Sequence, residues 1–179
     1  MVGRWVQCIA VGGGRSAAGE PSVQPIDRRG EWEVLRLSDD WSADLSEIVE
    51  RLSAKLVAPV LGGYVADSDA AACYFSPPSG QAAMLAINPS YDDSDDVHTE
   101  QWSDPDLHRA AAQKLAAWAA DYAPRHPSGD EIVASLSKLE DPDLSRDLGM
   151  RSLVFAEDGL RVIFDLLGIA DLDETVFAA

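Results

Sequence analysis

Residues 58–76 contain the longest apolar run of the chain, and Asp67-Ser68-Asp69 interrupts it once. Both halves of the run are rich in residues that favour strands. The interruption is typical of a turn, because Asp and Ser side chains bond the backbone two residues further on. This pattern predicts a hairpin with strands over 59–67 and 70–76. A second turn signal at 77–80 and another apolar run over 81–87 extend the hairpin to an antiparallel three-stranded meander at 59–87.

The N-terminal third predicts two further strands, over 4–11 and 32–37. The segment between them, residues 12–31, is rich in Gly, Ser, Pro and Arg and is predicted to be a flexible loop. Residues 43–57 have apolar side chains at helical spacing, including Leu45, Val49 and Leu52, which predicts an amphipathic helix.

The C-terminal half is predicted to be helical. One helix begins near Pro105, and Ser128 with Glu131 has the spacing of a capping box for the next. Residues 152–167 allow a hairpin at Asp158-Gly159 or a helix, and the apolar spacing together with a terminal glycine favours the helix. We therefore expect one α+β domain over 1–179, with an antiparallel sheet of about five strands covered by an N-terminal helix and several C-terminal helices.

Charge narrows the classes of partner. The chain has 31 acidic and 14 basic residues, a formal net charge of −17. Such a charge disfavours nucleic acid and anionic membranes as direct partners and is compatible with a basic protein. No apolar run approaches the ~18–20 residues of a membrane span, and the N-terminus lacks the features of a signal peptide. Cys8 and Cys73 fall in predicted strands as buried thiols, so a cytoplasmic protein is expected, although a bridge between neighbouring strands stays open.

The negative charge is concentrated in a predicted acidic loop over 88–106. Nine acidic residues and no Lys or Arg lie between Lys55 and Arg109. Trp102 lies at a loop–helix junction, where an aromatic side chain acts either as a helix staple or as a binding anchor. The residues predicted to contact a partner are Tyr91, Asp92, Asp93, Asp95, Asp96, Glu100 and Trp102.

Metal and catalytic motifs receive little support. Asp67 and Asp69 are the weak metal candidates, and turn formation already explains both. The acidic loop lacks the glycine of a calcium-binding EF-hand loop. The three histidines lack zinc-ligand spacing, and the glycines at 12–14 are not followed by the lysine and helix of a phosphate loop. No catalytic residue, resident metal or cofactor is therefore predicted.

These observations favour an acidic protein-binding module, an inhibitor or immunity-type protein that neutralises a basic partner. In broad character the chain resembles small acidic immunity proteins, but it carries no family motif from which an activity could be transferred. The alternatives are a small metal-dependent enzyme that uses Asp67 and Asp69, or a structural subunit of an assembly.

Overall fold

The predicted α+β architecture is confirmed by a computed structural model, which describes residues 5–20, 23–37, 44–66, 70–88, 97–143, 153, 155–170 and 172. One antiparallel sheet has the strand order β2-β3-β1-β4-β5-β6. The strands are β1 (Trp5–Val11), β2 (Val23–Arg29), β3 (Trp32–Leu37), β4 (Val60–Ala66), β5 (Ala70–Ser76) and β6 (Ala83–Asn88). The helices are α1 (Leu45–Leu56), α2 (Val97–Ser103), α3 (Pro105–Tyr122), α4 (Gly129–Ser137) and α6 (Ala156–Leu167).

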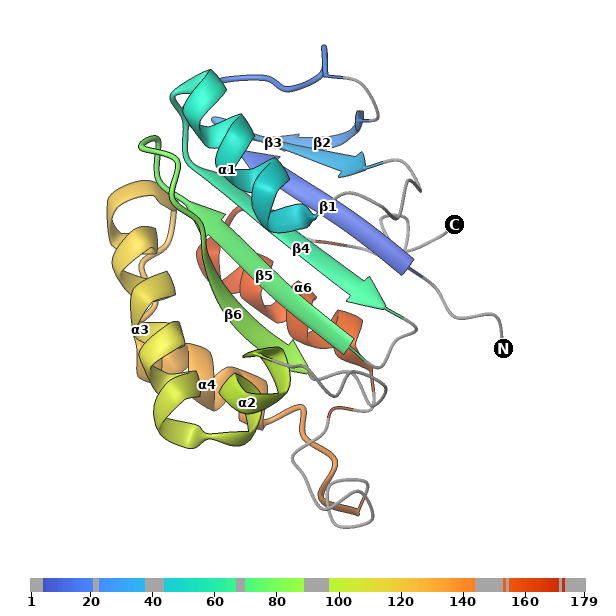
Figure 1. The fold of residues 1–179 in the computed structure, drawn as a ribbon, viewed down its shortest axis with the longest axis vertical. Helices are drawn as coiled ribbons and strands as arrows, with labels where there is room; N and C mark the ends of the chain where they lie inside the picture. The colour runs from blue at the N-terminus through green and yellow to red at the C-terminus, as the bar shows by residue number, and fades with distance from the viewer. Residues whose placement is uncertain are drawn as a thin grey trace.

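Helices cover both faces of the sheet. Figure 1 shows α1 in front of the strands and α6 behind them, with α3 and α4 beyond the β6 side. The buried residues accordingly form two clusters. The larger unites α3, α4 and α6 with one sheet face, and the smaller lies under α1. The predicted N-terminal and C-terminal helices therefore take opposite faces of the sheet.

The predicted hairpin is confirmed as β4 and β5, which pair in register from Val60–Ser76 to Ala66–Ala70. Its turn, including the metal candidates Asp67 and Asp69, lies outside the described residues. β6 pairs antiparallel with β5 and completes the predicted meander, while β1 pairs with β4 on the other side. Both strands of the hairpin are thus interior strands of the sheet.

Two adjacent glycines allow both helix layers to approach this hairpin. Gly62 and Gly63 of β4 face opposite sides of the sheet, since successive strand residues alternate. A Cβ on Gly62 would lie 2.6 Å from Val49 Cγ2 of α1, and one on Gly63 would lie 2.5 Å from Leu160 Cδ1 of α6. Both distances are far inside van der Waals contact, so the absence of side chains at these positions sets how closely α1 and α6 pack.

The prediction of a flexible loop over 12–31 is wrong for residues 23–29, which form β2 at the edge of the sheet and pair with β3. Pro25 and the charged residues 27–29 do not resemble an interior strand. At an edge, however, a proline is tolerated, because the N–H that it lacks would have faced solvent. The pairing shifts register between Pro25 and Asp27. This extra strand raises the sheet from the predicted five strands to six.

One other prediction is corrected, and one alternative left open by the sequence is decided. The prediction of an acidic loop over 88–106 is wrong for Asn88, which ends β6, for 97–103, which form α2, and for 105–106, which begin α3. Residues 156–167 form α6, which confirms the helix and excludes the hairpin for this segment. Gly168 ends α6 in the left-handed conformation at φ 69°, as the glycine signal predicts.

Val57 provides a test of local backbone strain. It follows α1 at φ 51° and ψ 51°, and 68% of its surface is exposed. The left-handed region costs an L-residue about 1–2 kcal/mol, and a β-branched side chain is especially unsuited to it. Val57→Asn should raise the free energy of unfolding by about 1 kcal/mol, since Asn adopts this conformation more readily. Denaturant unfolding measures the change, with Val57→Ala as the control that removes the β-branch without adding the Asn carboxamide. An Asn variant less stable than the wild type would contradict this explanation.

Candidate partner-binding surface

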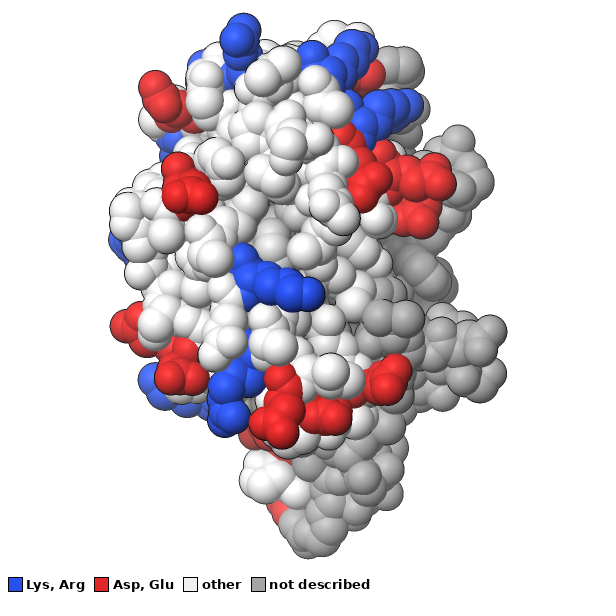
Figure 2. Space-filling view, turned by 60° about the vertical axis from the view of Figure 1, so that its left-hand side comes forward, with Lys and Arg blue, Asp and Glu red and all other residues white. Residues whose placement is uncertain are grey.

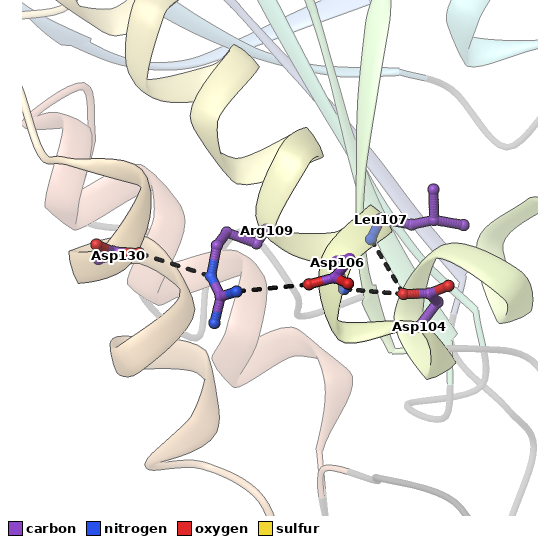
Figure 3. Close-up of polar contacts among 5 residues, drawn as sticks. All are labelled: Asp104, Asp106, Leu107, Arg109 and Asp130. Atoms are coloured by element: carbon purple, nitrogen blue, oxygen red, sulfur yellow. Dashed lines mark hydrogen bonds and ion pairs between the residues drawn. The ribbon is translucent and has the colours of Figure 1, made fainter.

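Carboxylates converge where α2 ends and where α3 and α4 begin. Asp104 caps α3 through its Oδ1, which accepts hydrogen bonds from the backbone N–H groups of Asp106 at 2.8 Å and Leu107 at 3.3 Å. These bonds are drawn in Figure 3. Acidic side chains favour helix N-termini because the first N–H groups lack intrahelical partners and carry partial positive charge. Capping therefore explains locally why acids collect here.

The start of α4 repeats this chemistry. Ser128 and Glu131 form the predicted capping box: the Ser128 Oγ accepts from the Glu131 N–H at 3.2 Å, and Glu131 Oε2 accepts from the Ser128 N–H at 2.7 Å. The hydrogen bonds donated by the Ser128 backbone and hydroxyl lower the pKa of the Glu131 carboxyl. Glu131 therefore keeps its negative charge to lower pH than an ordinary glutamate.

Arg109 joins the two helix starts. Its guanidinium lies 3.6 Å from the Asp106 carboxylate and 3.8 Å from the Asp130 carboxylate (Figure 3). The three side chains are 52%, 94% and 86% exposed, respectively. Exposed ion pairs of this kind contribute about 0–1 kcal/mol, because water competes for both charges. The cluster is therefore a solvated charged surface and contributes little to holding the fold together.

We define the acidic end as the five exposed residues Glu100, Asp104, Asp106, Asp130 and Glu131. Two of them, Asp106 and Asp130, pair with the Arg109 guanidinium, and Asp104 lies at the start of the same helix as Asp106 (Figure 3). In Figure 2 both signs of charge are present on the side that carries α3, and acidic side chains gather toward its lower end. The described surface thus has a local acidic concentration within a mixed charge pattern.

The predicted contact residues divide into three groups. Glu100 is exposed on α2 and belongs to the acidic end. Tyr91, Asp92, Asp93, Asp95 and Asp96 lie outside the described residues. Trp102 is fully buried, so the prediction that its side chain is a surface anchor is corrected. Sequence reasoning missed the contributions of Asp104, Asp106, Asp130 and Glu131, whose cap positions were the available signal.

Trp102 is buried where α2 packs against α3. Its indole packs edge-on against the His108 ring, with centroids 4.9 Å apart and planes at 78°. His108 is itself fully buried, and its Nε2 lies 3.1 Å from the Ala86 carbonyl oxygen of β6. The sequence allows Trp102 to be either a helix staple or a binding anchor, and its burial favours the packing role of a staple.

The glycines at 12–14 serve the fold. The N–H groups of Gly12 and Gly14 donate to the carbonyls of Pro59 and Glu31 at 3.0 and 2.9 Å. The Glu33 carboxylate then accepts from the Ser16 hydroxyl at 2.7 Å and from the Ala17 N–H at 3.0 Å. The hydrogen-bond donors that follow these glycines are therefore already bonded to a carboxylate of the protein. The negative charge of this carboxylate would repel a phosphate.

The two cysteines are free and buried. Each lies opposite Gly63, on the strands flanking β4, so their Cα atoms are separated by two strand spacings, about 9–10 Å. This exceeds the ~7 Å limit for a disulfide. Burial raises the pKa of both thiols to about 12, so neither is a reactive thiolate at neutral pH.

Metal and membrane features can be assessed only for the described ranges. Within them, no three His, Cys, Asp or Glu side chains gather as a metal site. None of the helices in these ranges is both long and apolar enough to cross a membrane. Comparisons with protein-family models, curated proteins and solved structures found no match. The functional argument therefore rests on this chain alone.

Proposed function

We propose that this protein is an acidic protein-binding module, of the inhibitor or immunity type, that neutralises a basic partner through the acidic end. The observation that carries the proposal is that exposed carboxylates lie on α2 and at the starts of α3 and α4, where Asp106 and Asp130 both pair with Arg109. Oppositely charged surfaces accelerate association and discriminate against wrongly charged partners. Tyr91, Asp92, Asp93, Asp95 and Asp96 remain proposed contributors, because they immediately precede α2 in the sequence.

The placement of the acidic end suits such a role. Its carboxylates lie on helices that pack through buried residues, including His108 and Ile132, so their backbones are held by the core. Fixed charges lose less conformational freedom on binding than charges on a flexible chain. Buried thiols and the net charge of −17 further support a cytoplasmic protein that avoids nucleic acid and anionic membranes.

Charge variants test this proposal in both directions. Asp106→Asn with Asp130→Asn should weaken partner binding about two- to thirtyfold, because each rim charge contributes about 0.2–1 kcal/mol. Arg109→Gln should strengthen it, since the competing guanidinium is removed. The matched control is Glu47→Gln with Asp121→Asn, which removes the same charge from exposed positions on α1 and at the far end of α3.

The measurement begins with capture on the immobilised protein from lysate at low and high salt, followed by titration of the retained protein against each variant. A basic protein retained at low salt, released by salt and weakened only by the acidic-end variant would support the proposal. If no basic protein is retained at either salt concentration, the proposal is wrong. Equal effects of the acidic-end and control variants would instead indicate nonspecific charge attraction.

A further inference from the structure

The outer edge of β6 is closed by side chains. The Ala86 N–H donates to Gln101 Oε1 at 2.6 Å, and Gln101 Nε2 donates to the Met84 carbonyl at 3.4 Å. His108 Nε2 bonds the Ala86 carbonyl, so this nitrogen must carry the proton. Backbone groups that would otherwise be free at a sheet edge therefore have partners from α2 and α3.

The side-chain amide of Gln101 makes the same hydrogen bonds to β6 that the backbone of a parallel strand would make. In a parallel sheet, a residue bonds the two residues that flank its neighbour on the adjacent strand. Its N–H donates to the carbonyl of the preceding residue, and its carbonyl accepts from the N–H of the following residue. The Gln101 side chain makes this pair of bonds to Met84 and Ala86, which flank Leu85. It thus occupies the position that one peptide unit of an additional strand would take.

The opposite edge of the sheet is protected by different means. β2 contains Pro25, an irregular register and the charged residues Asp27, Arg28 and Arg29. Proline, bulges and charges on an edge strand all oppose pairing with another chain. β6 has the sequence Ala-Met-Leu-Ala-Ile-Asn, with no charge and no proline. If α2 and α3 did not cover it, β6 would be the edge open to pairing with a strand of another chain.

We infer that α2 is an edge cap, in which Gln101 prevents β6 from accepting the β6 strand of a second copy of this chain. A second copy is the expected partner because β6 is uncharged, so two β6 strands can meet without direct charge repulsion although each chain carries −17. Antiparallel β6–β6 pairing also places the same surface on both sides of a two-fold axis. This inference is independent of the proposed partner binding, which uses exposed carboxylates.

Gln101→Met tests the cap, because methionine keeps the length of the side chain but can make neither backbone bond. Light scattering over a concentration series is expected to show association of this variant beyond that of the wild type. Ser103→Ala, at an exposed position on the same helix, should behave as the wild type. Adding Met84→Lys to Gln101→Met should reverse the association, because a lysine on an edge strand opposes strand addition.

Hydrogen exchange of residues 83–88 separates capping from general destabilisation. In dilute solution, Gln101→Met should exchange about tenfold faster in this segment, as expected for the loss of two hydrogen bonds. Gln101→Glu, which keeps an acceptor but adds a charge, should exchange faster without associating. The inference is overturned if Gln101→Met associates no more than the wild type, or if Met84→Lys does not reverse its association.

Discussion

Trp102→Ala is expected to lower the free energy of unfolding by about 3–5 kcal/mol. The indole is fully buried and packs against His108, so its removal would leave a cavity between α2, α3 and the edge of β6. Folded domains are stable by only about 5–15 kcal/mol, so the variant will lose much of its stability. Denaturant unfolding followed by circular dichroism measures the loss without relying on tryptophan fluorescence.

Trp102→Phe is the matched control, since it retains an aromatic ring and should lose much less stability than Trp102→Ala. The result also separates the two roles considered for Trp102. Unchanged stability in Trp102→Ala, together with loss of binding to a captured partner, would support a surface anchor and contradict the packing described above.

Gly63→Val is expected to lower the free energy of unfolding by about 3 kcal/mol, at the upper end of the usual cost of overpacking. Even the Cβ would lie 2.5 and 2.8 Å from the two terminal carbons of Leu160. Leu160 is fully buried and cannot turn toward solvent, so α6 must shift or the strand must bend. Thermal and denaturant unfolding of the purified variant measure this cost.

Gly19→Val serves as the control, because nothing lies within 4 Å of a Cβ at that position; it should change stability by no more than about 0.5 kcal/mol. A second variant identifies the clash. Leu160→Ala should cost less in the Gly63→Val background than in the wild type, since it makes room for the new side chain. Additive costs would show that the clash with Leu160 does not explain the effect of Gly63→Val.

Local patterns predicted the elements whose stability is mainly local. The capping box at Ser128 and Glu131 forms as expected, and the apolar spacing before Gly168 identified α6. The strand-favouring apolar run interrupted by Asp67-Ser68-Asp69 likewise predicted β4 and β5. In each case, residues within a few positions of one another supply most of the determining contacts, so a single sequence contains the signal.

Other elements depend on contacts between distant segments. β2 becomes a strand only because β3 offers it a partner, and its own composition resembles a loop. The role of Gln101 is equally non-local, since the backbone atoms it binds lie on β6, 15 and 17 residues earlier. For the candidate surface, the acidic stretch pointed to Glu100, but only the packing of α3 beside α4 brought Asp106 and Asp130 to one guanidinium.

The sequence by itself determined an acidic α+β domain with a hairpin at β4 and β5, because turn chemistry, periodicity and charge are properties of neighbouring residues. The tertiary structure alone decided the closeness of the two helix layers, the burial of Trp102 and the closure of β6 by Gln101. The physical reason is that burial and hydrogen-bond partners across the sheet depend on which distant segments meet, and the pattern of residues along one segment does not contain that information.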